Sequence, residues 1–258
     1  MDPGFLWKKE LRTKGYEYRA SARSVRKLGR FSRVWHRILK LSDMGPRTKR
    51  RTVFEVGCGG GIHLVQFALQ GWNCFGLDVS SEVLDRAKRF IGEIEQYAGR
   101  KLSIHLYTGD IIDFEVGSFE KSDLVFHVGV LEHFLDDAQR LLALKKMFAF
   151  AKPGGYVVSV VPNGMHPWRK PMKEQRLGGY NIPEIDYTNV LMEHEFKECG
   201  ATDIVILPHN LFDYMRLKKN FLFKIVYYFA QIVPLSWIPK SFAFRHSGTI
   251  IGIARRIS

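Results

Sequence analysis

The sequence has few cysteines and no pattern that would pair them. Its 258 residues include three, Cys58, Cys74 and Cys199, and none of them belongs to a C-x-x-C pair. An odd count without paired spacing argues against a disulfide framework, and the lack of C-x-x-C argues against a cysteine zinc site. We expect no metal site, and a reducing, cytoplasmic location.

Long hydrophobic runs are also missing. The most apolar stretch, Phe221–Trp237, is interrupted by Lys224, Gln231 and Pro234. It falls short of the ~20 apolar residues that a membrane-spanning helix needs, and the first residues lack the charged-then-apolar pattern of a signal peptide. We therefore predict a chain that is at most peripheral to a membrane.

Acidic residues are scarce, and they are unevenly placed. The chain has 26 Asp and Glu against 39 Lys and Arg, a formal net charge of +13. Residues 1–51 carry +12, residues 52–137 carry −8 and residues 138–258 carry +9. The hydrophobic content of 46% excludes a disordered chain. The basic flanks indicate an anionic partner, a membrane surface or a nucleic acid.

From residue 52 onward, short apolar runs alternate with amphipathic stretches. We expect strands over 53–56, 73–77, 102–107, 124–127, 155–161, 204–207 and 249–254, and helices over 62–69, 81–96, 136–151 and 189–199. This alternation indicates a parallel sheet covered on both faces. Before it, the apolar spacing from Leu28 to Leu39 predicts one amphipathic helix within a basic segment.

The first predicted strand runs directly into a turn of four glycines between residues 57 and 61. Glycines let a backbone turn tightly and let a ligand approach it closely, so this turn is typical of a nucleotide-type site. The dinucleotide fingerprint does not fit, because Ile62 and Leu64 stand where Gly or Ala is required. Glu55, two positions before the first glycine, suits a cationic ligand better than a pyrophosphate.

Carboxylates also follow the second and third predicted strands. Asp78 is placed to accept hydrogen bonds from two ribose hydroxyls, and Asp110 can accept one from an exocyclic amine. Each aspartate alone would fit a helix cap. Three acids at three successive strand ends beside a glycine turn favour a ligand site.

With these motifs the chain resembles the class I S-adenosylmethionine-dependent methyltransferases over about residues 50–210 and 248–256. The Leu-Glu-His segment at 131–133 resembles the small-molecule enzymes of ubiquinone and menaquinone biosynthesis. The resemblance implies an α/β fold, a Rossmann-like doubly wound seven-stranded sheet with the last strand antiparallel. We expect residues 1–50 to form a basic helical cap, and 51–258 a methyltransferase domain with insertions at 162–186 and 212–247, the first a loop and the second helical.

The resemblance implies S-adenosyl-L-methionine as the cofactor and assigns its contacts. The methionine part would meet the glycine turn, the ribose Asp78, the adenine the residues after the second and third strands, and the sulfonium the end of the fourth strand. The cofactor-binding residues are then Glu55, Gly57, Cys58, Gly59, Gly61, Asp78, Val79, Asp110, Ile111, His127 and Val128, with Cys58 as a small filler.

Three further residues are candidates on the acceptor side. His133 is the candidate base, although it fits equally well as a residue that orders Glu132 or the cofactor carboxylate. His166 and Trp168, in the loop after the fifth strand, are candidate substrate-binding residues. The fourth strand is not followed by an Asn/Asp-Pro-Pro-Tyr/Phe motif, which argues against methylation of an exocyclic or amide nitrogen.

The basic flanks do not by themselves identify the methyl acceptor. Residues 214–246 hold nine aromatic residues and six Lys or Arg without an acidic one. They fit a membrane-surface helix or, slightly better, a buried helix covering a sheet edge. The N-terminal block fits either a lid or a solvated basic face. We predict in-line methyl transfer to a small, hydrophobic or lipid-linked acceptor, with an anionic membrane surface as a further partner. An RNA methyltransferase and a non-catalytic cofactor-binding subunit are the alternatives.

Overall fold

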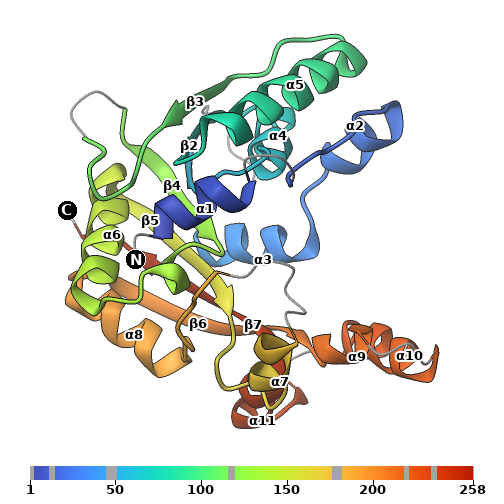
Figure 1. The fold of residues 1–258 in the computed structure, drawn as a ribbon, viewed down its shortest axis with the longest axis vertical. Helices are drawn as coiled ribbons and strands as arrows, with labels where there is room; N and C mark the ends of the chain where they lie inside the picture. Colours follow the sequence, from blue (N-terminus) through green and yellow to red (C-terminus); the bar gives the residue numbers. More distant parts are fainter. Residues whose placement is uncertain are drawn as a thin grey trace.

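One seven-stranded sheet organises the computed structural model, which describes residues 3–11, 15–44, 51–115, 120–175, 182–217, 221–233 and 237–257 (Figure 1). The strand order is β3-β2-β1-β4-β5-β7-β6. Strand β7 pairs antiparallel with both β5 and β6, and the other pairings are parallel. The predicted α/β fold is therefore confirmed. The strands are β1 Thr52–Val56, β2 Asn73–Asp78, β3 Ile104–Thr108, β4 Ser122–Val128, β5 Ala151–Pro162, β6 Thr202–Leu211 and β7 Ser247–Arg255.

Helices cover both faces of this sheet (Figure 1). Helices α6 (Asp137–Phe150) and α8 (Asn189–Glu198) share a core with Phe54 of β1. Helices α3 (Arg33–Leu41) and α4 (Ile62–Leu69) share another with Val53, and α5 (Ser81–Ala98) packs beside α4. Successive strand residues point to opposite faces, so the two neighbours Val53 and Phe54 stabilise different layers.

The predicted single helix over residues 28–39 is wrong, because the chain forms two helices there. Helix α2 (Ala22–Leu28) ends at Gly29, whose N–H bonds to the carbonyl oxygen of Val25. Helix α3 begins after Ser32, whose side chain accepts a hydrogen bond from the Trp35 N–H. Leu28 packs beside α5 and Trp35 packs beside α4. Apolar residues that belong to two separate cores therefore have the spacing expected of a single amphipathic helix. A further helix, α1 (Pro3–Leu11), precedes them.

Both insertions carry short helices, although the sequence predicts a loop for the first. The first contains α7 (Arg169–Glu174), and the second contains α9 (Asp213–Leu217), α10 (Phe221–Ala230) and α11 (Lys240–His246). The preference for a buried helix is wrong for α10, where only Tyr227 and Ala230 are buried. Phe221 is 73% exposed and Phe229 67% exposed. In the part of the chain that the structure describes, no helix has both the length and the apolar character to cross a bilayer.

Candidate functional site

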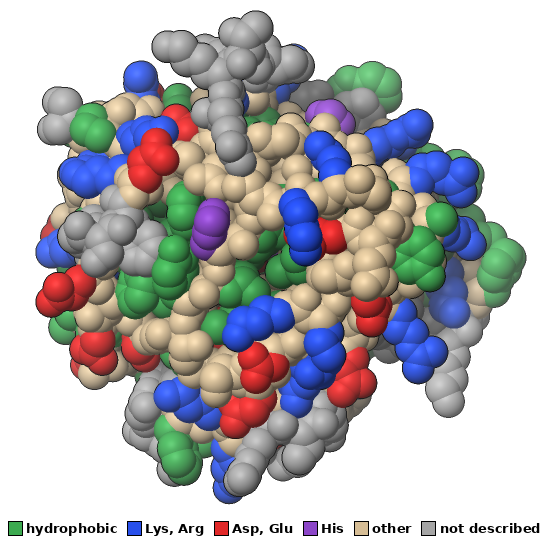
Figure 2. All heavy atoms as spheres, turned by 90° about the horizontal axis from the view of Figure 1, so that it is seen from above, with side chains coloured by type: hydrophobic (Ala, Val, Ile, Leu, Met, Phe, Trp, Pro, Cys, Tyr) green, Lys and Arg blue, Asp and Glu red, His purple; other side chains and the backbone are tan. Residues whose placement is uncertain are grey.

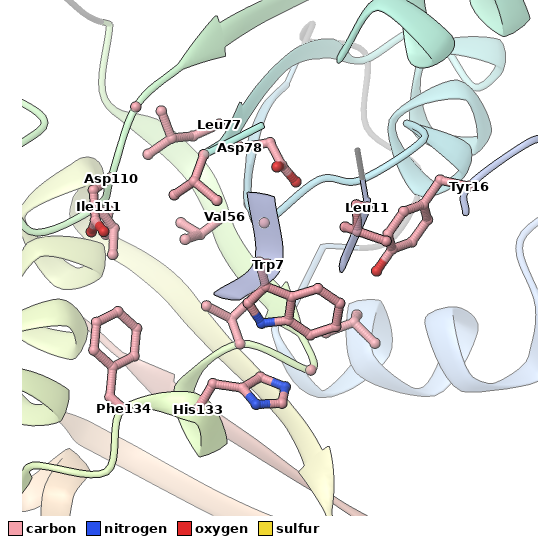
Figure 3. Close-up of a pocket in the computed structure, with 16 residues that line it drawn as sticks. Trp7, Leu11, Tyr16, Val56, Leu77, Asp78, Asp110, Ile111, His133 and Phe134 are labelled. Carbon is pink, nitrogen blue, oxygen red and sulfur yellow. The ribbon is translucent and has the colours of Figure 1, made fainter. Parts of the chain in front are cut away.

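A cavity of about 680 Å³, counted with the space at its open mouth, lies at the carboxyl edge of the parallel strands (Figure 3). The walls are mostly apolar and come from strand ends and from the N-terminal segment. They comprise Trp7, Leu11, Tyr16, Val56, Gly57, Leu77, Asp78, Val79, Gly109, Asp110, Ile111, Val128, Gly129, Val130, His133 and Phe134.

Gly57 of the glycine turn lines the cavity, whereas Gly59 and Gly61, predicted to do the same, do not. The conformation of the turn requires glycine at all three positions. Gly57, Gly59 and Gly61 have φ values of +65°, +52° and +75°, which side chains other than glycine rarely adopt. A Cβ on Gly57 would lie 2.4 Å from Val130 Cγ2, and one on Gly59 would lie 2.8 Å from the Tyr16 ring. The turn therefore needs glycine both for its backbone conformation and for the close packing of Val130 and Tyr16 against it.

Asp78 ends β2 and places its carboxylate at the cavity wall (Figure 3). Its Oδ2 accepts a hydrogen bond from the Gly59 N–H at 2.9 Å, and its Oδ1 accepts one from the Ser80 N–H at 3.0 Å. Burial raises the pKa of Asp78, and these hydrogen bonds oppose the shift. Each oxygen keeps a second lone pair, so the carboxylate can also accept from a pair of ligand hydroxyls. Val79 lines the cavity beside it.

Asp110 and Ile111, after β3, lie on the opposite wall (Figure 3). Asp110 Oδ1 accepts a hydrogen bond from the Ile112 N–H at 2.9 Å. The side chain thus stabilises the turn after β3 and lines the cavity, and no helix among the described residues begins there for it to cap. Ile111 is 4% exposed and adds an apolar surface that suits a ring.

Glu55 does not line this cavity. It is 2% exposed, and its Oε1 lies 2.8 Å from His63 Nδ1. Burial raises the pKa of Glu55, while the pairing with His63 opposes this. For His63, burial alone would lower the pKa, and the Glu55 carboxylate more than offsets it. The pair therefore holds a proton beside the glycine turn, and His63 reaches a neighbouring cavity instead.

Cys58 and His127 also lie outside the cavity lining. Cys58 packs against Gly76, and burial raises the pKa of its thiol. His127 is fully buried; its Nδ1 accepts from the Val130 N–H at 3.3 Å, so its Nε2 carries the proton and donates to Ser159 Oγ at 2.7 Å. Burial lowers the pKa of His127 to about 3. Val128, the next residue, does line the cavity.

His133 lies in the cavity at the end of a short 3-10 helix, Leu131–His133. Its Nδ1 donates to the carbonyl oxygen of Pro183 at 3.0 Å, which leaves the lone pair of the neutral ring on Nε2. Burial lowers the pKa of His133, so the ring is neutral near pH 7. The Trp7 indole lies edge-on to it, with ring centroids 5.1 Å apart (Figure 3). Nothing in the sequence around Trp7 marked it as a site residue.

A buried carboxylate stands next to His133. Glu132 is 2% exposed, and its Oε2 has no hydrogen-bond partner. Burial, with a smaller contribution from Glu184, raises the pKa of Glu132 to about 8. Ligand atoms of Glu132, His133 and Glu184 lie within 4.8 Å of one another, close enough to hold a metal ion that the sequence did not predict. Arg169 Nη2, 2.6 Å from Glu184 Oε1, supplies a positive charge there.

A second cavity, of about 770 Å³ with its open space, adjoins the first through Val128 and Gly129. Residues of α3, Glu132, His63 and the ends of β5 and β6 line it. An acceptor held there would meet a ligand of the first cavity at the end of β4. The sequence did not reveal this role of α3, because the helix lies far away along the chain.

His166 and Trp168 line neither of these two cavities. The His166 and Tyr214 ring centroids lie 4.8 Å apart, and Trp168 stacks on Tyr214 at 5.7 Å with an interplanar angle of 16°. Burial lowers the pKa of His166 to about 4. The two residues thus join the first insertion to α9.

The N-terminal segment is fixed over the first cavity by a buried arginine of α5. Arg86 Nη1 donates to the carbonyl oxygens of Leu11 and Gly15, at 2.7 and 3.1 Å. Helix α1 accordingly crosses the carboxyl edge of the sheet (Figure 1), and Trp7, Leu11 and Tyr16 form the outer wall (Figure 3). This arrangement is that of a lid.

Sheet order, glycine turn and strand-end carboxylates together define a Rossmann-like methyltransferase fold with a site for a nucleoside cofactor. The family model described as "Methyltransferase domain" matches residues 54–159. The ubiquinone biosynthesis O-methyltransferase of Vibrio parahaemolyticus is 34% identical over 192 residues, 66% of this chain and 73% of the relative. The chain belongs to the class I S-adenosylmethionine-dependent methyltransferases, and the family's cofactor is the one that the sequence predicted.

Other similarities are more limited in extent. The ubiquinone biosynthesis O-methyltransferase of Hydrogenovibrio crunogenus is 33% identical over 109 residues, 42% of each chain. The match therefore spans less than half of that relative. The solved structure of magnesium protoporphyrin IX methyltransferase from Synechocystis PCC 6803 with bound SAH has a TM-score of 0.59 at 12% identity and covers 99% of this chain and 100% of its own. This likeness concerns the fold.

Proposed function

We propose that this protein is an active S-adenosylmethionine-dependent methyltransferase whose acceptor is a small, hydrophobic or lipid-linked molecule. The observation that carries the proposal is the pair of cavities that meet at Val128 and Gly129. The first offers a carboxylate for hydroxyls and apolar walls for a ring, and the second is largely apolar with a few polar side chains, among them His63 and Glu132. Such a pairing fits a cofactor and an acceptor with one reactive polar group.

The cofactor supplies a methyl group already activated on a positive sulfur. The protein's task is to hold the acceptor in line, and positioning of this kind lowers barriers by roughly 7–11 kcal/mol. Where the acceptor is a hydroxyl, its proton must leave, and the free Nε2 of neutral His133 can accept it. The negative middle of the chain, −8 over residues 52–137, also favours a cationic cofactor.

We further propose that the protein docks peripherally on an anionic membrane surface from the cytoplasmic side. Exposed Phe221, Phe229 and Trp237 in and after α10 accompany a basic, acid-free sequence. Aromatic and basic residues on a short helix are typical of an interfacial segment. In Figure 2 acidic, basic and apolar side chains are interspersed on the face seen from the α5 end.

The test is methyl transfer from labelled S-adenosylmethionine to cell extract separated into lipid, RNA, protein and small-molecule fractions. We expect label in the lipid or small-molecule fraction. Label in RNA would establish the RNA methyltransferase alternative instead. Cofactor binding without label in any fraction would support a non-catalytic cofactor-binding subunit. No observation on the described residues favours that alternative.

A further inference from the structure

A third cavity continues outward from the proposed acceptor cavity. It lies between α3, the end of β6 and the last turn of α10, and measures about 1,040 Å³ with its open space. It shares Val34, Ile38, His209 and Asn210 with the second cavity. The three cavities therefore lie next to one another in a row, from the cofactor site to the surface beside α10.

Two arginines of α3 give this outer groove its charge. Arg33 and Arg37 stand four residues apart, hence on one side of the helix, and both line the groove. Among its described lining residues there is no Asp or Glu, and no ion pair joins either arginine to a described carboxylate. His209 stays neutral, because burial and the nearby Arg37 lower its pKa to about 4. The groove is positive and its charge is not neutralised.

The opposite wall is apolar and is firmly held. It consists of Ala230, Ile232 and Val233 at the end of α10. Gln231 fixes this turn, since its Nε2 donates to the carbonyl oxygen of Leu211 in β6 at 2.8 Å. Ile232 is 66% exposed, so the apolar wall runs on into the exposed side of α10. The groove thus combines a positively charged wall from α3 with an apolar wall from the end of α10.

We propose that this groove binds the phosphate of a lipid-linked acceptor at Arg33 and Arg37, with its hydrocarbon chain along α10 and its reactive group in the second cavity. The inference rests on the proposed function and narrows its substrate class. Guanidinium groups suit phosphate because their planar array of N–H donors matches its oxygens. A single strand of RNA would need a basic track with aromatic platforms for its bases, whereas the wall facing these arginines is aliphatic.

The position of this groove beside the second cavity distinguishes phosphate binding at the groove from general electrostatic attraction of the protein to a bilayer. Lipid headgroups of a membrane would meet any exposed arginine of the N-terminal block, including Arg26 of α2. A phosphate that belongs to the acceptor must occupy this groove, because the groove adjoins the second cavity. Arg37 and Arg26 therefore form a matched pair, in which equal charges differ only in position.

The binding test uses dodecyl phosphate below its micellar concentration, with dodecanol and inorganic phosphate as partial ligands, in titration calorimetry on the full chain. We expect dodecyl phosphate to bind more tightly than either partial ligand. Arg37→Gln should weaken this binding about tenfold or more, in line with the loss of a hydrogen bond to a charged group, and Arg26→Gln should leave it unchanged.

Equal losses in Arg37→Gln and Arg26→Gln would overturn the proposal in favour of non-specific attraction. Dodecanol or inorganic phosphate binding as well as dodecyl phosphate would overturn it too. In flotation with vesicles of phosphatidylglycerol and phosphatidylcholine, the two variants should behave alike; a loss confined to Arg37→Gln would assign the groove to bilayer headgroups instead. S-adenosylmethionine binding, measured on the same samples, reports separately on the proposed function.

Discussion

The carboxyl edge of the sheet and the C-terminal insertion differ in how they treat polar and apolar groups. At the sheet edge, Asp78 and His127 are buried and each makes two hydrogen bonds. In the insertion, the side chains of Phe221 and Phe229 are exposed to solvent. Buried polar groups need partners, so the edge is a fixed arrangement. Exposed aromatic groups indicate a surface that gains from a partner.

The contrast predicts that a change at the sheet edge has the larger effect, and Asp78 offers the strongest test. We expect Asp78→Ala to weaken S-adenosylmethionine binding at least ~100-fold, since each hydrogen bond to a charged group contributes about 1.5–3 kcal/mol. Titration calorimetry measures this, and Asp85→Ala, an exposed carboxylate of α5, is the control. Undiminished binding in a folded Asp78→Ala protein would remove the cofactor assignment.

His133 tests whether the fixed edge also carries chemistry. His133→Ala should lower kcat about 100-fold or more, the scale of a positioned base, while cofactor affinity changes far less. The assay is transfer from labelled cofactor to the acceptor found in the extract screen. Full activity would leave His133 as a residue that orders the Trp7 lid. His194→Ala, exposed on α8, should be silent.

The insertion is tested by removing its exposed aromatic side chains. Phe221→Ser with Phe229→Ser should reduce flotation with anionic vesicles about tenfold or more, because a Phe side chain transferred from water contributes roughly 1.5–3 kcal/mol. Thermal stability and cofactor binding should stay the same. Tyr97→Ser with Val190→Ser removes exposed apolar groups from α5 and α8 as a control. Equal flotation of both double variants would contradict membrane docking.

The smallest expected effect is a pH dependence of stability from the buried edge. The folded pKa of His127 is about 3, below its ordinary value of 6.5. Between these values the unfolded state binds more protons, so stability falls as pH falls, by at most ~1.4 kcal/mol per pH unit for one group.

Urea unfolding between pH 6 and pH 5 measures this slope. His127→Asn should flatten it by about 1 kcal/mol per pH unit, and His105→Asn, on the exposed edge strand β3, should not. Identical slopes in all three proteins would mean that His127 takes up its proton without unfolding.

Much of the fold could be read from periodicity. Strand and helix alternation from residue 52 predicted the layers, and the resemblance supplied the seven-stranded sheet with an antiparallel last strand, which the structure confirms. The N-terminal helices were less accessible, because Leu28 and Trp35 mimic one stripe although they pack in different cores. Periodicity records that a residue is buried but not which neighbour buries it.

The site shows the same division. The sequence by itself determined the glycine turn and the strand-end aspartates, because positive φ angles and a shared sheet edge follow from local chain geometry. Only the tertiary structure decided that Glu55 binds His63, that Trp7 meets His133, and that Arg33 and Arg37 face α10. These pairings join residues from different elements. They depend on how the helices pack on the sheet. That packing is driven by the burial of apolar surface over the whole chain.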